Sequence, residues 1–267
     1  LSDQVTVLRV PRNKLTAIDA IGLTLRNLTE IDFSDNAIAS VTNNFITTGP
    51  GNPWPLMRRF NISGNLLRSL PTSMPFNSWQ YLESLDFSRN WFTIVWGSLN
   101  YGLTADLSRL PPRVNLQIRD NHGWTFLDWR QESLTRLFPQ IGQLTQLTGA
   151  RLNFNLFETL PDEIGNCPAI WQLDLSYCLN LRALPPTIGK LTQLGQLLLS
   201  NSANLTSLPD TLDSMTSLYQ VSFQNCGLKS LPPSFFRLVN LTTLDLSGNQ
   251  LETIQPGFQR LFWTGGG

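Results

Sequence analysis

Residues 241–251, Leu241-Thr-Thr-Leu244-Asp-Leu246-Ser-Gly-Asn249-Gln-Leu251, contain the pattern that decides the fold of this chain. Leu244 and Leu246 alternate with polar residues, which is the period-two pattern of a short strand with one buried side. Asn249 follows this strand, where the chain must turn. Its amide can both donate and accept hydrogen bonds, so it can satisfy backbone groups in the turns of neighbouring units.

The same pattern, Leu-x-x-Leu-x-Leu-x-x-Asn, recurs about ten times, and successive copies lie 23 to 25 residues apart over most of the chain. A repeat of this period indicates a solenoid, because no single unit can bury its apolar face alone. We call the ninth residue of each copy the ladder residue. The ladder residues are Asn13, Asn36, Asn65, Asn90, Asn121, Asn155, Cys178, Ser202, Cys226 and Asn249.

A second apolar pattern lies between the strands and predicts one or two helical turns that return the chain to the next strand. Leu-Pro pairs begin at residues 70, 160, 184, 208 and 231, where proline suits an exit turn and would harm a paired strand. Two apolar positions three residues apart follow and should point into the core. They are Ile141, Ile164, Ile188, Leu212 and Phe235, and then Leu144, Cys167, Leu191, Met215 and Leu238.

Over residues 5 to about 258 these patterns resemble the leucine-rich repeat. Residues 184–194, Leu-Pro-Pro-Thr-Ile-Gly-Lys-Leu-Thr-Gln-Leu, are similar to its short, Leu-Pro-containing class, and residues 173–185 also resemble repeats of plant immune receptors and some bacterial effectors. The Gly-x-Ile-Pro signature of plant surface receptors is missing. The resemblance implies an α/β solenoid, a leucine-rich-repeat horseshoe with a parallel concave β-sheet and short helical or irregular convex segments.

We expect residues 1–258 to form a single solenoid and residues 259–267 to form a C-terminal tail or linker. The middle, residues 91–146, is a degenerate part in which the spacing between ladder residues lengthens. Insertions of this kind either shape a ligand surface or fill the irregular repeat with a local core. The aromatic residues that support both interpretations are Trp91, Trp96, Trp124 and Trp129.

The composition of the chain limits the classes of partner and indicates a cellular location. Nineteen basic and 19 acidic residues cancel, which disfavours a nucleic-acid or anionic-membrane surface. No apolar run is long enough for a transmembrane helix. Charged residues make up 14% of the chain, against about 25% in typical domains. A neutral surface rich in hydroxyl and amide groups favours an extracellular or cell-surface protein, and the start at Leu1 suggests a mature form or an excised segment.

Cysteine usage argues against an extracellular location, because the Cys-rich caps of extracellular leucine-rich-repeat proteins are absent. We expect Cys167, Cys178 and Cys226 to be small buried thiols. Cys178 and Cys226 lie two repeats apart, about 10 Å at the usual strand spacing and beyond the reach of a disulfide.

Four Asn-x-Ser/Thr sequons are glycosylation candidates if the chain is secreted. They are Asn27, Asn61, Asn204 and Asn240.

The pattern also predicts which side chains project from the exposed face of the sheet. Phe154 and Tyr177 hold equivalent positions in neighbouring repeats, about 5 Å apart. Trp171 and Tyr219 share another position two repeats apart. Exposed aromatic residues on a sheet suggest a binding surface, with scattered surface aromatics as the alternative. The predicted ligand-binding residues are Phe154, Trp171, Tyr177, Leu198, Tyr219, Arg151 and Asp174.

The first four repeats carry charges of both signs on the same face. This mosaic would steer a partner or would be ordinary solvated surface. Its members are Arg9, Arg12, Glu30, Asp32, Asp35, Arg58, Arg59, Asp86 and Arg89.

Signals for catalysis are weak, and we expect no enzyme, no cofactor and no metal. The one histidine, His122, lies beside Asp120, and no cysteine is predicted nearby. No Cys/His spacing typical of a metal site occurs. Asp174 and Asp245 lie three repeats apart, about 14 Å by strand spacing, which is too far for a catalytic carboxylate pair.

The sequence therefore favours a non-catalytic, ligand-recognising module of a secreted or receptor-like protein. Its partner would be a protein, a peptide or a glycan on the concave face. One alternative is a cytosolic scaffold or sensor domain, as the resemblance to immune receptors and effectors implies. Another is a structural part of a larger chain or assembly, docked through the solenoid ends. Leucine-rich repeats serve many unrelated partners, so the family alone does not supply the ligand.

Overall fold

The computed structural model describes residues 4–18, 25–41, 54–70, 74, 79–92, 114–119, 121, 125–252 and 257. The chain divides into two compact units, Leu1–Trp124 and Thr125–Gly267. Each unit is described by itself below, as unit 1 and unit 2.

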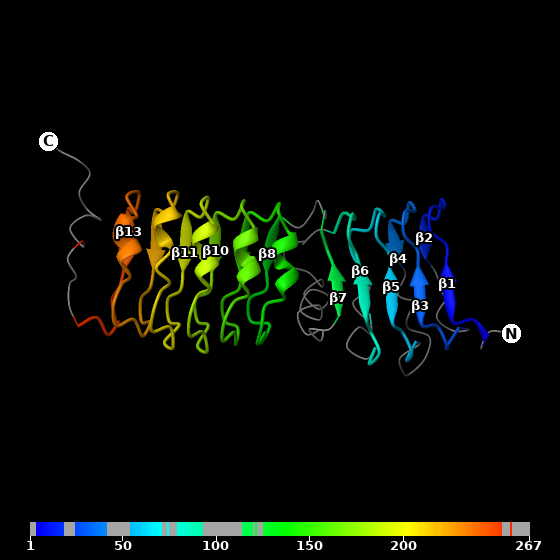
Figure 1. Cartoon of the computed structure of the whole chain (residues 1–267), viewed down its shortest axis with the longest axis horizontal. Helices are drawn as coiled ribbons and strands as arrows, with labels where there is room; N and C mark the ends of the chain where they lie inside the picture. Colours follow the sequence, from blue (N-terminus) through cyan, green and yellow to red (C-terminus); the bar gives the residue numbers. More distant parts are fainter. Residues whose placement is uncertain are drawn as a thin grey trace. The chain divides into compact units, whose positions relative to one another are not determined.

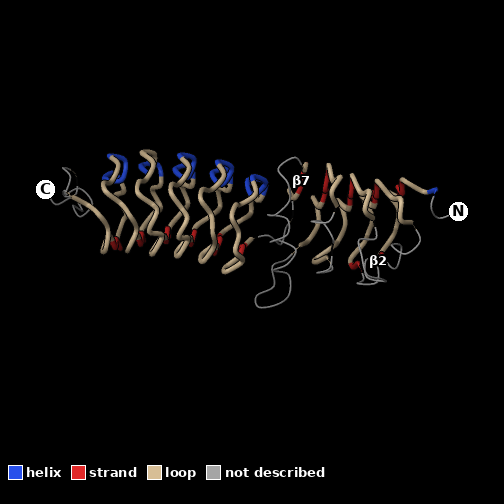
Figure 2. Tube along the Cα trace, turned by 90° about the horizontal axis from the view of Figure 1, so that it is seen from below, coloured by secondary structure: helices blue, strands red, loops and turns tan. Residues whose placement is uncertain are grey.

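Unit 1 contains a five-stranded parallel sheet whose strands follow one another in chain order (Figure 1). A second, two-stranded parallel sheet lies on the opposite side of the unit (Figure 2). The five strands are β1 (Val7–Arg9), β3 (Glu30–Asp32), β5 (Arg59–Asn61), β6 (Ser84–Asp86) and β7 (Asn115–Gln117), and the two opposite strands are β2 (Ala17–Ile18) and β4 (Ser40–Val41).

Unit 2 contains a six-stranded parallel sheet, again in chain order, with short 3-10 helices on the side opposite the strands (Figures 1 and 2). The strands are β8 (Phe126–Asp128), β9 (Gly149–Arg151), β10 (Gln172–Asp174), β11 (Gln196–Leu198), β12 (Gln220–Ser222) and β13 (Thr243–Asp245). The helices are η4 (Pro139–Gln143), η5 (Asp162–Asn166), η6 (Pro186–Lys190), η7 (Leu212–Ser214) and η8 (Pro233–Arg237). The predicted fold class, a leucine-rich-repeat solenoid with a parallel sheet and short helical returns, is confirmed.

The buried positions are those that the repeat predicts. In register, the middle residues of β10 and β11, Leu173 and Leu197, pair directly and are almost fully buried. The two apolar positions of each return segment, such as Ile188 and Leu191, are also buried. Pro185 has φ −67° and ψ 147° immediately before η6, which is the extended exit conformation expected of the Leu-Pro pairs.

The ladder residues bind successive repeats to one another, as expected. Asn90 is fully buried, its Nδ2 donates to the carbonyl oxygen of Ile62 (3.0 Å), and its Oδ1 accepts from the amide of Leu67 (3.2 Å). Where cysteine replaces asparagine, the Cys178 thiol donates to Leu152 O (3.5 Å). The thiol makes only the donor half of the interaction, so the ladder is weaker there.

Glycines allow the return segments of unit 2 to stack closely. A Cβ on Gly189 would lie 2.0 Å from the carbonyl oxygen of Thr211 in the next repeat, and one on Gly165 would lie 2.4 Å from that of Thr187. No side chain fits at these distances. The Ile-Gly pairs of the sequence are therefore a packing requirement, which was not predicted.

One strand was not predicted. β8 carries Leu127 only 11 residues after Leu116 of β7, which leaves no room for a full return segment, and its ladder position is occupied by Glu132 instead of asparagine. β7 pairs with β6, and β8 pairs with β9. The single solenoid over residues 1–258 stays a prediction, and the predicted tail lies outside the described residues.

Candidate functional site

The residue before each ladder residue contributes a side chain to the exposed face of unit 2. At this position the backbone is left-handed in every described repeat of the unit. The turn that delivers the ladder side chain to the core requires this conformation, which Gly, Asn and Asp adopt most readily. The occupants are Gln131, Phe154, Tyr177, Asn201, Asn225 and Gly248.

Phe154 and Tyr177 are the residues of this series for which the left-handed backbone is least favourable. Their φ values are 60° and 58°, and bulky side chains rarely adopt such values. Each side chain is more than 40% exposed, and the two rings stack with centroids 4.4 Å apart and planes inclined by 6°. Stacking is worth about 0.5–1.5 kcal/mol, whereas strained backbone of this kind costs about 1–3 kcal/mol per residue. The repeat does not need these rings.

Two exposed leucines lie close to the stacked rings in sequence. Leu156 and Leu179 follow the ladder residues of the β9 and β10 repeats and are 42% and 54% exposed. We call Phe154, Leu156, Tyr177 and Leu179 the apolar rim. These two leucines were not predicted, because no residue after the ladder position was expected on the exposed face. The sequence feature that could have indicated them is a leucine directly after the ladder residue.

The other predicted aromatic pair lies at the opposite ends of the strands. Trp171 and Tyr219 immediately precede β10 and β12, and both are exposed. Gly195 lies between them, because its amide donates to Trp171 O (2.8 Å) and its carbonyl accepts from the amide of Tyr219 (3.0 Å). A Cβ on Gly195 would lie 2.7 Å from Cε1 of Tyr219, so the tyrosine ring lies over this glycine. The structure thus places both residues at the predicted equivalent positions.

Polar side chains occupy part of the strand surface of unit 2. Gln196 Nε2 donates to Gln220 Oε1 across β11 and β12 (2.7 Å). Half-buried Leu198 lies on the same surface. Asp174 Oδ1 accepts from the amide of Ser176 (3.0 Å), so this predicted ligand-binding residue also closes a turn. Asp32, Asn61, Asp86 and Asp245 make the same turn contact in their repeats.

Arg151 takes the place that aspartate holds in the neighbouring repeat. Its guanidinium lies 5.3 Å from the centroid of the Phe126 ring and 3.8 Å from Asp128. The Phe126 ring lies over Gly149, much as Tyr219 lies over Gly195. The predicted ligand-binding residues therefore share one face of one unit, although they do not form a single cluster.

The charged mosaic of unit 1 is ordered by ion pairs. Glu30 lies between Arg9 (2.5 Å) and Arg59 (3.6 Å), and Arg59 also lies 3.4 Å from Glu83. Glu83 in turn contacts Arg58 (2.7 Å). The hydrogen bond from Arg9 holds the pKa of the Glu30 carboxyl below its ordinary value and raises the pKa of Arg9. Glu83 was not among the predicted residues, although it precedes its strand just as Arg58 does.

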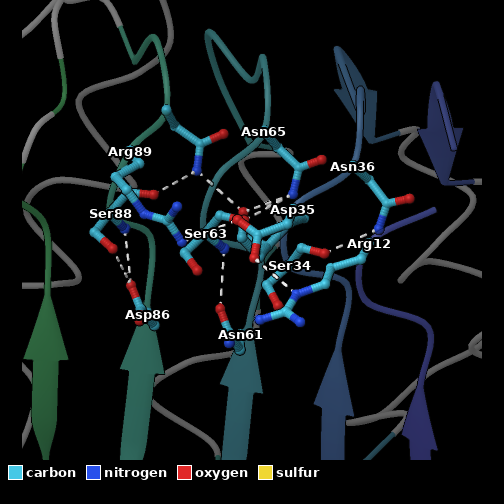
Figure 3. Close-up of polar contacts among 12 residues, drawn as sticks. Arg12, Ser34, Asp35, Asn36, Asn61, Ser63, Asn65, Asp86, Ser88 and Arg89 are labelled. Carbon is cyan, nitrogen blue, oxygen red and sulfur yellow. Dashed lines mark hydrogen bonds and ion pairs between the residues drawn. The ribbon is translucent and has the colours of Figure 1, made fainter. Parts of the chain in front are cut away.

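A second group of charges lies at the carboxyl ends of the same strands (Figure 3). Asp35 contacts Arg89 (3.0 Å) and Arg12 (4.0 Å), although Arg89 follows β6, two repeats away. Gly64 occupies the equivalent position between Asp35 and Arg89, and a Cβ there would collide with the Asp35 carboxylate. The missing side chain therefore opens the space in which this long-range pair forms.

The tryptophans of the middle segment separate into different environments. Trp129 is 1% exposed and packs on Phe138 with ring centroids 5.4 Å apart, which agrees with the local-core interpretation for this residue. Trp91 is 48% exposed. Trp96, Trp124, His122 and Asp120 lie outside the described residues.

All three cysteines are free and buried, as expected. Burial raises the pKa of Cys167 to about 12 and that of Cys178 to about 11, and it also raises the pKa of Cys226. Thiols with raised pKa values are poor nucleophiles, because the thiolate is the reactive species. They act here as core and ladder residues.

The four sequons lie in different surroundings. Asn204 and Asn240 are exposed, and their side chains donate to Leu179 O (2.7 Å) and Thr216 O (2.6 Å) of the preceding repeats. Asn61 is half-buried in β5, with its Oδ1 accepting from the amide of Ser63 (3.0 Å), and Asn27 is half-buried before β3. Asn204 and Asn240 are therefore the more accessible acceptors.

Within the described ranges, no three His, Cys, Asp or Glu side chains come together in a way that could hold a metal ion. No helix in this part of the chain has the length and apolarity needed to cross a membrane.

Comparison with known proteins agrees with the repeat pattern. The family model for the Leucine Rich Repeat matches residues 240–261. No curated protein sequence matches the chain significantly.

Similar solved structures are leucine-rich-repeat proteins of several kinds. A protein of Leptospira interrogans is 22% identical over 93% of this chain and 74% of its own, with a TM-score of 0.33. The functional domain of InlJ from Listeria monocytogenes, which includes a cysteine ladder, is 20% identical over 96% of this chain and 56% of its own, with a TM-score of 0.46. The ectodomain of the Arabidopsis thaliana membrane receptor kinase GASSHO1/SCHENGEN3 is 21% identical over 96% of this chain and 37% of its own, with a TM-score of 0.37.

Proposed function

Because this chain is built from leucine-rich repeats, we propose that it is a non-catalytic binding module that holds its ligand on the exposed sheet face of unit 2. The ligand is a protein or peptide, with a glycan as the alternative. The residues proposed to contact it are Phe154, Trp171, Tyr177, Leu198, Tyr219, Arg151 and Asp174.

One observation carries this proposal. Phe154 and Tyr177 hold strained left-handed positions where neighbouring repeats have Asn201 and Asn225, yet their rings face solvent. Strain that the fold does not need points to function at that place. Large exposed aromatic groups with adjacent aliphatic ones are typical of protein-binding surfaces, where they supply most of the affinity.

The apolar rim favours a protein or peptide over a glycan. Leu156 and Leu179 add aliphatic surface that an apolar side chain of a partner can bury. The amides of Gln196 and Gln220 on β11 and β12 supply donors and acceptors for a peptide backbone. Sugars would use the aromatic residues and the amides but not the leucines.

The test uses a peptide library selected on the intact chain, followed by affinity measurements with the double variant Phe154→Asn/Tyr177→Asn. Asparagine is chosen because the fold uses it at this position in later repeats. We expect selected peptides to lose about tenfold or more in affinity, as for buried aromatic anchors. The matched control is Val239→Asn, which removes another exposed apolar side chain. Unchanged affinity in the double variant, or an equal loss in the control, would refute the proposal.

We further propose that the module works outside the cell, as part of a secreted or receptor-like protein. The low charge content supports this location, and the exposed Asn204 and Asn240 are its glycosylation sites, with Asn27 and Asn61 less accessible. A cytosolic scaffold or sensor, or a structural part of a larger assembly, is the alternative. Intact mass of the natively sourced protein before and after enzymatic removal of N-glycans tests the location, because N-glycans would exclude the cytosolic alternative. An unchanged mass with three free thiols favours the cytosolic alternative.

A further inference from the structure

Unit 1 presents a second surface, which the proposed ligand site of unit 2 does not use. In the described residues, its strands, the residues directly before them and the turns up to the ladder residues carry six arginines and no lysine, and Lys14 directly follows the first ladder residue. We call these six arginines the arginine face. They are Arg9, Arg12, Arg58, Arg59, Arg89 and Arg119.

The charges on this face are arranged in two layers. The arginine side chains in the ion pairs are 52% to 86% exposed, whereas Glu30, Asp35 and Glu83, which pair with them, are 16% to 43% exposed. Two further acidic residues, Asp32 and Asp86, are half-buried and accept hydrogen bonds from turn amides. The guanidinium groups therefore form the outer layer of this face. The total charge of the face is close to zero, because five carboxylates oppose six arginines.

Each paired carboxylate holds two guanidinium groups in place. Glu30 binds Arg9 and Arg59, and Glu83 binds Arg58 and Arg59. The Arg58 guanidinium also lies 5.7 Å from the centroid of the Tyr81 ring. A guanidinium has five N–H donors in a rigid fork, so one or two ion-pair contacts leave others for a partner. Exposed ion pairs contribute little to stability, and the fold does not require this arrangement.

We propose that the arginine face binds an acidic protein segment, through the side-chain carboxylates of Asp or Glu residues in the partner. Guanidinium forks match carboxylates in geometry as well as in charge. A nucleic acid is a poorer match, because its closely spaced phosphates would meet Glu30, Asp35 and Glu83 between the arginines. A peptide can place separate carboxylates on separate arginines.

Fluorescence anisotropy with a labelled oligoglutamate peptide tests this inference on the intact chain. We expect saturable binding that weakens with added salt, and no binding of an oligoglutamine peptide of equal length. Arg59→Gln should weaken binding roughly tenfold, because this residue joins both carboxylate groups of the network. Arg59→Lys should recover only part of the loss, because lysine keeps the charge without the fork.

The matched control is Arg182→Gln, which removes the same charge from an exposed site in unit 2. It should leave oligoglutamate affinity within about twofold of the wild type, as expected for a surface charge that does not belong to the arginine face. Arg12→Gln/Arg89→Gln, which leaves Glu30 and Glu83 paired, gives an independent second variant and should also weaken binding. The inference is overturned if oligoglutamate does not bind, if Arg182→Gln weakens binding as much as Arg59→Gln, or if a DNA duplex binds more tightly than oligoglutamate.

Discussion

The exposed sheet faces of the two units differ in chemistry although the repeat beneath them is the same. In unit 1 the residues on neighbouring strands form ion pairs, as Glu30 does with Arg9 and Arg59. In unit 2 the corresponding surface carries the stacked Phe154 and Tyr177 rings. The buried leucines and ladder residues fix the strand and the turn, so the exposed positions are free to specialise. The two faces therefore suit two kinds of partner.

The largest expected difference between the units lies in the ladder. Asn90→Ala in unit 1 would leave Ile62 O and the amide of Leu67 buried without their partner. We expect a loss of about 4 kcal/mol in the free energy of unfolding, from two buried polar groups. Cys178→Ala in unit 2 removes one weak thiol contact and should cost about 1 kcal/mol. Urea denaturation of both variants checks this contrast, which equal losses would contradict.

A smaller difference in stability is expected between glycine substitutions on the helical side and on the sheet face of unit 2. Gly189→Ala places a Cβ against the Thr211 backbone and should cost about 2–3 kcal/mol, as overpacking does. Gly195→Ala meets only the edge of the Tyr219 ring, which can swing away, and should cost less than about 1 kcal/mol. Thermal unfolding of the two variants measures the difference. A larger loss in Gly195→Ala would show that the Tyr219 ring is part of the core.

The ion pairs of unit 1 predict a small pH dependence. The pKa of Glu30 is lowered in the folded chain. A carboxylate of this kind stabilises the fold above its unfolded pKa, about 4.3, and the contribution is lost as the pH falls through the lower folded value. Because the pair is partly exposed, we expect a change below about 1 kcal/mol.

The free energy of unfolding of the wild type minus that of Glu30→Gln, followed by urea denaturation from neutral to acidic pH, measures this contribution. Arg9→Gln should abolish most of the same pH dependence, since Arg9 is its main cause. A difference that stays constant as the pH falls would contradict the predicted role of the pair.

Much of this architecture could be predicted from the repeat, because burial and turn geometry impose the same residue types every 23 to 25 positions. The strand β8 could not, because Glu132 replaces its ladder asparagine and no full return segment precedes it. The site was foreseen only in part. Phe154 and Tyr177 follow from the period, whereas Leu156 and Leu179 required knowledge of which side chains the turn after the ladder leaves exposed.

Contacts that long side chains make across a glycine could not be predicted from the repeat pattern either. The pair between Asp35 and Arg89 depends on the absence of a side chain at Gly64, and the position of the Tyr219 ring depends on Gly195. Periodicity assigns each residue to a face. It does not say which neighbour a long side chain reaches across a glycine.

The central claim is that the exposed Phe154 and Tyr177 rings serve a partner and not the fold. The most direct test is the free energy of unfolding of Phe154→Asn/Tyr177→Asn, measured by urea denaturation against the wild type. Relief of left-handed strain should offset the lost stacking, so we expect the free energy of unfolding to change by less than about 1 kcal/mol or to rise. A loss of about 2 kcal/mol or more would contradict it and would make the rings part of the structural core.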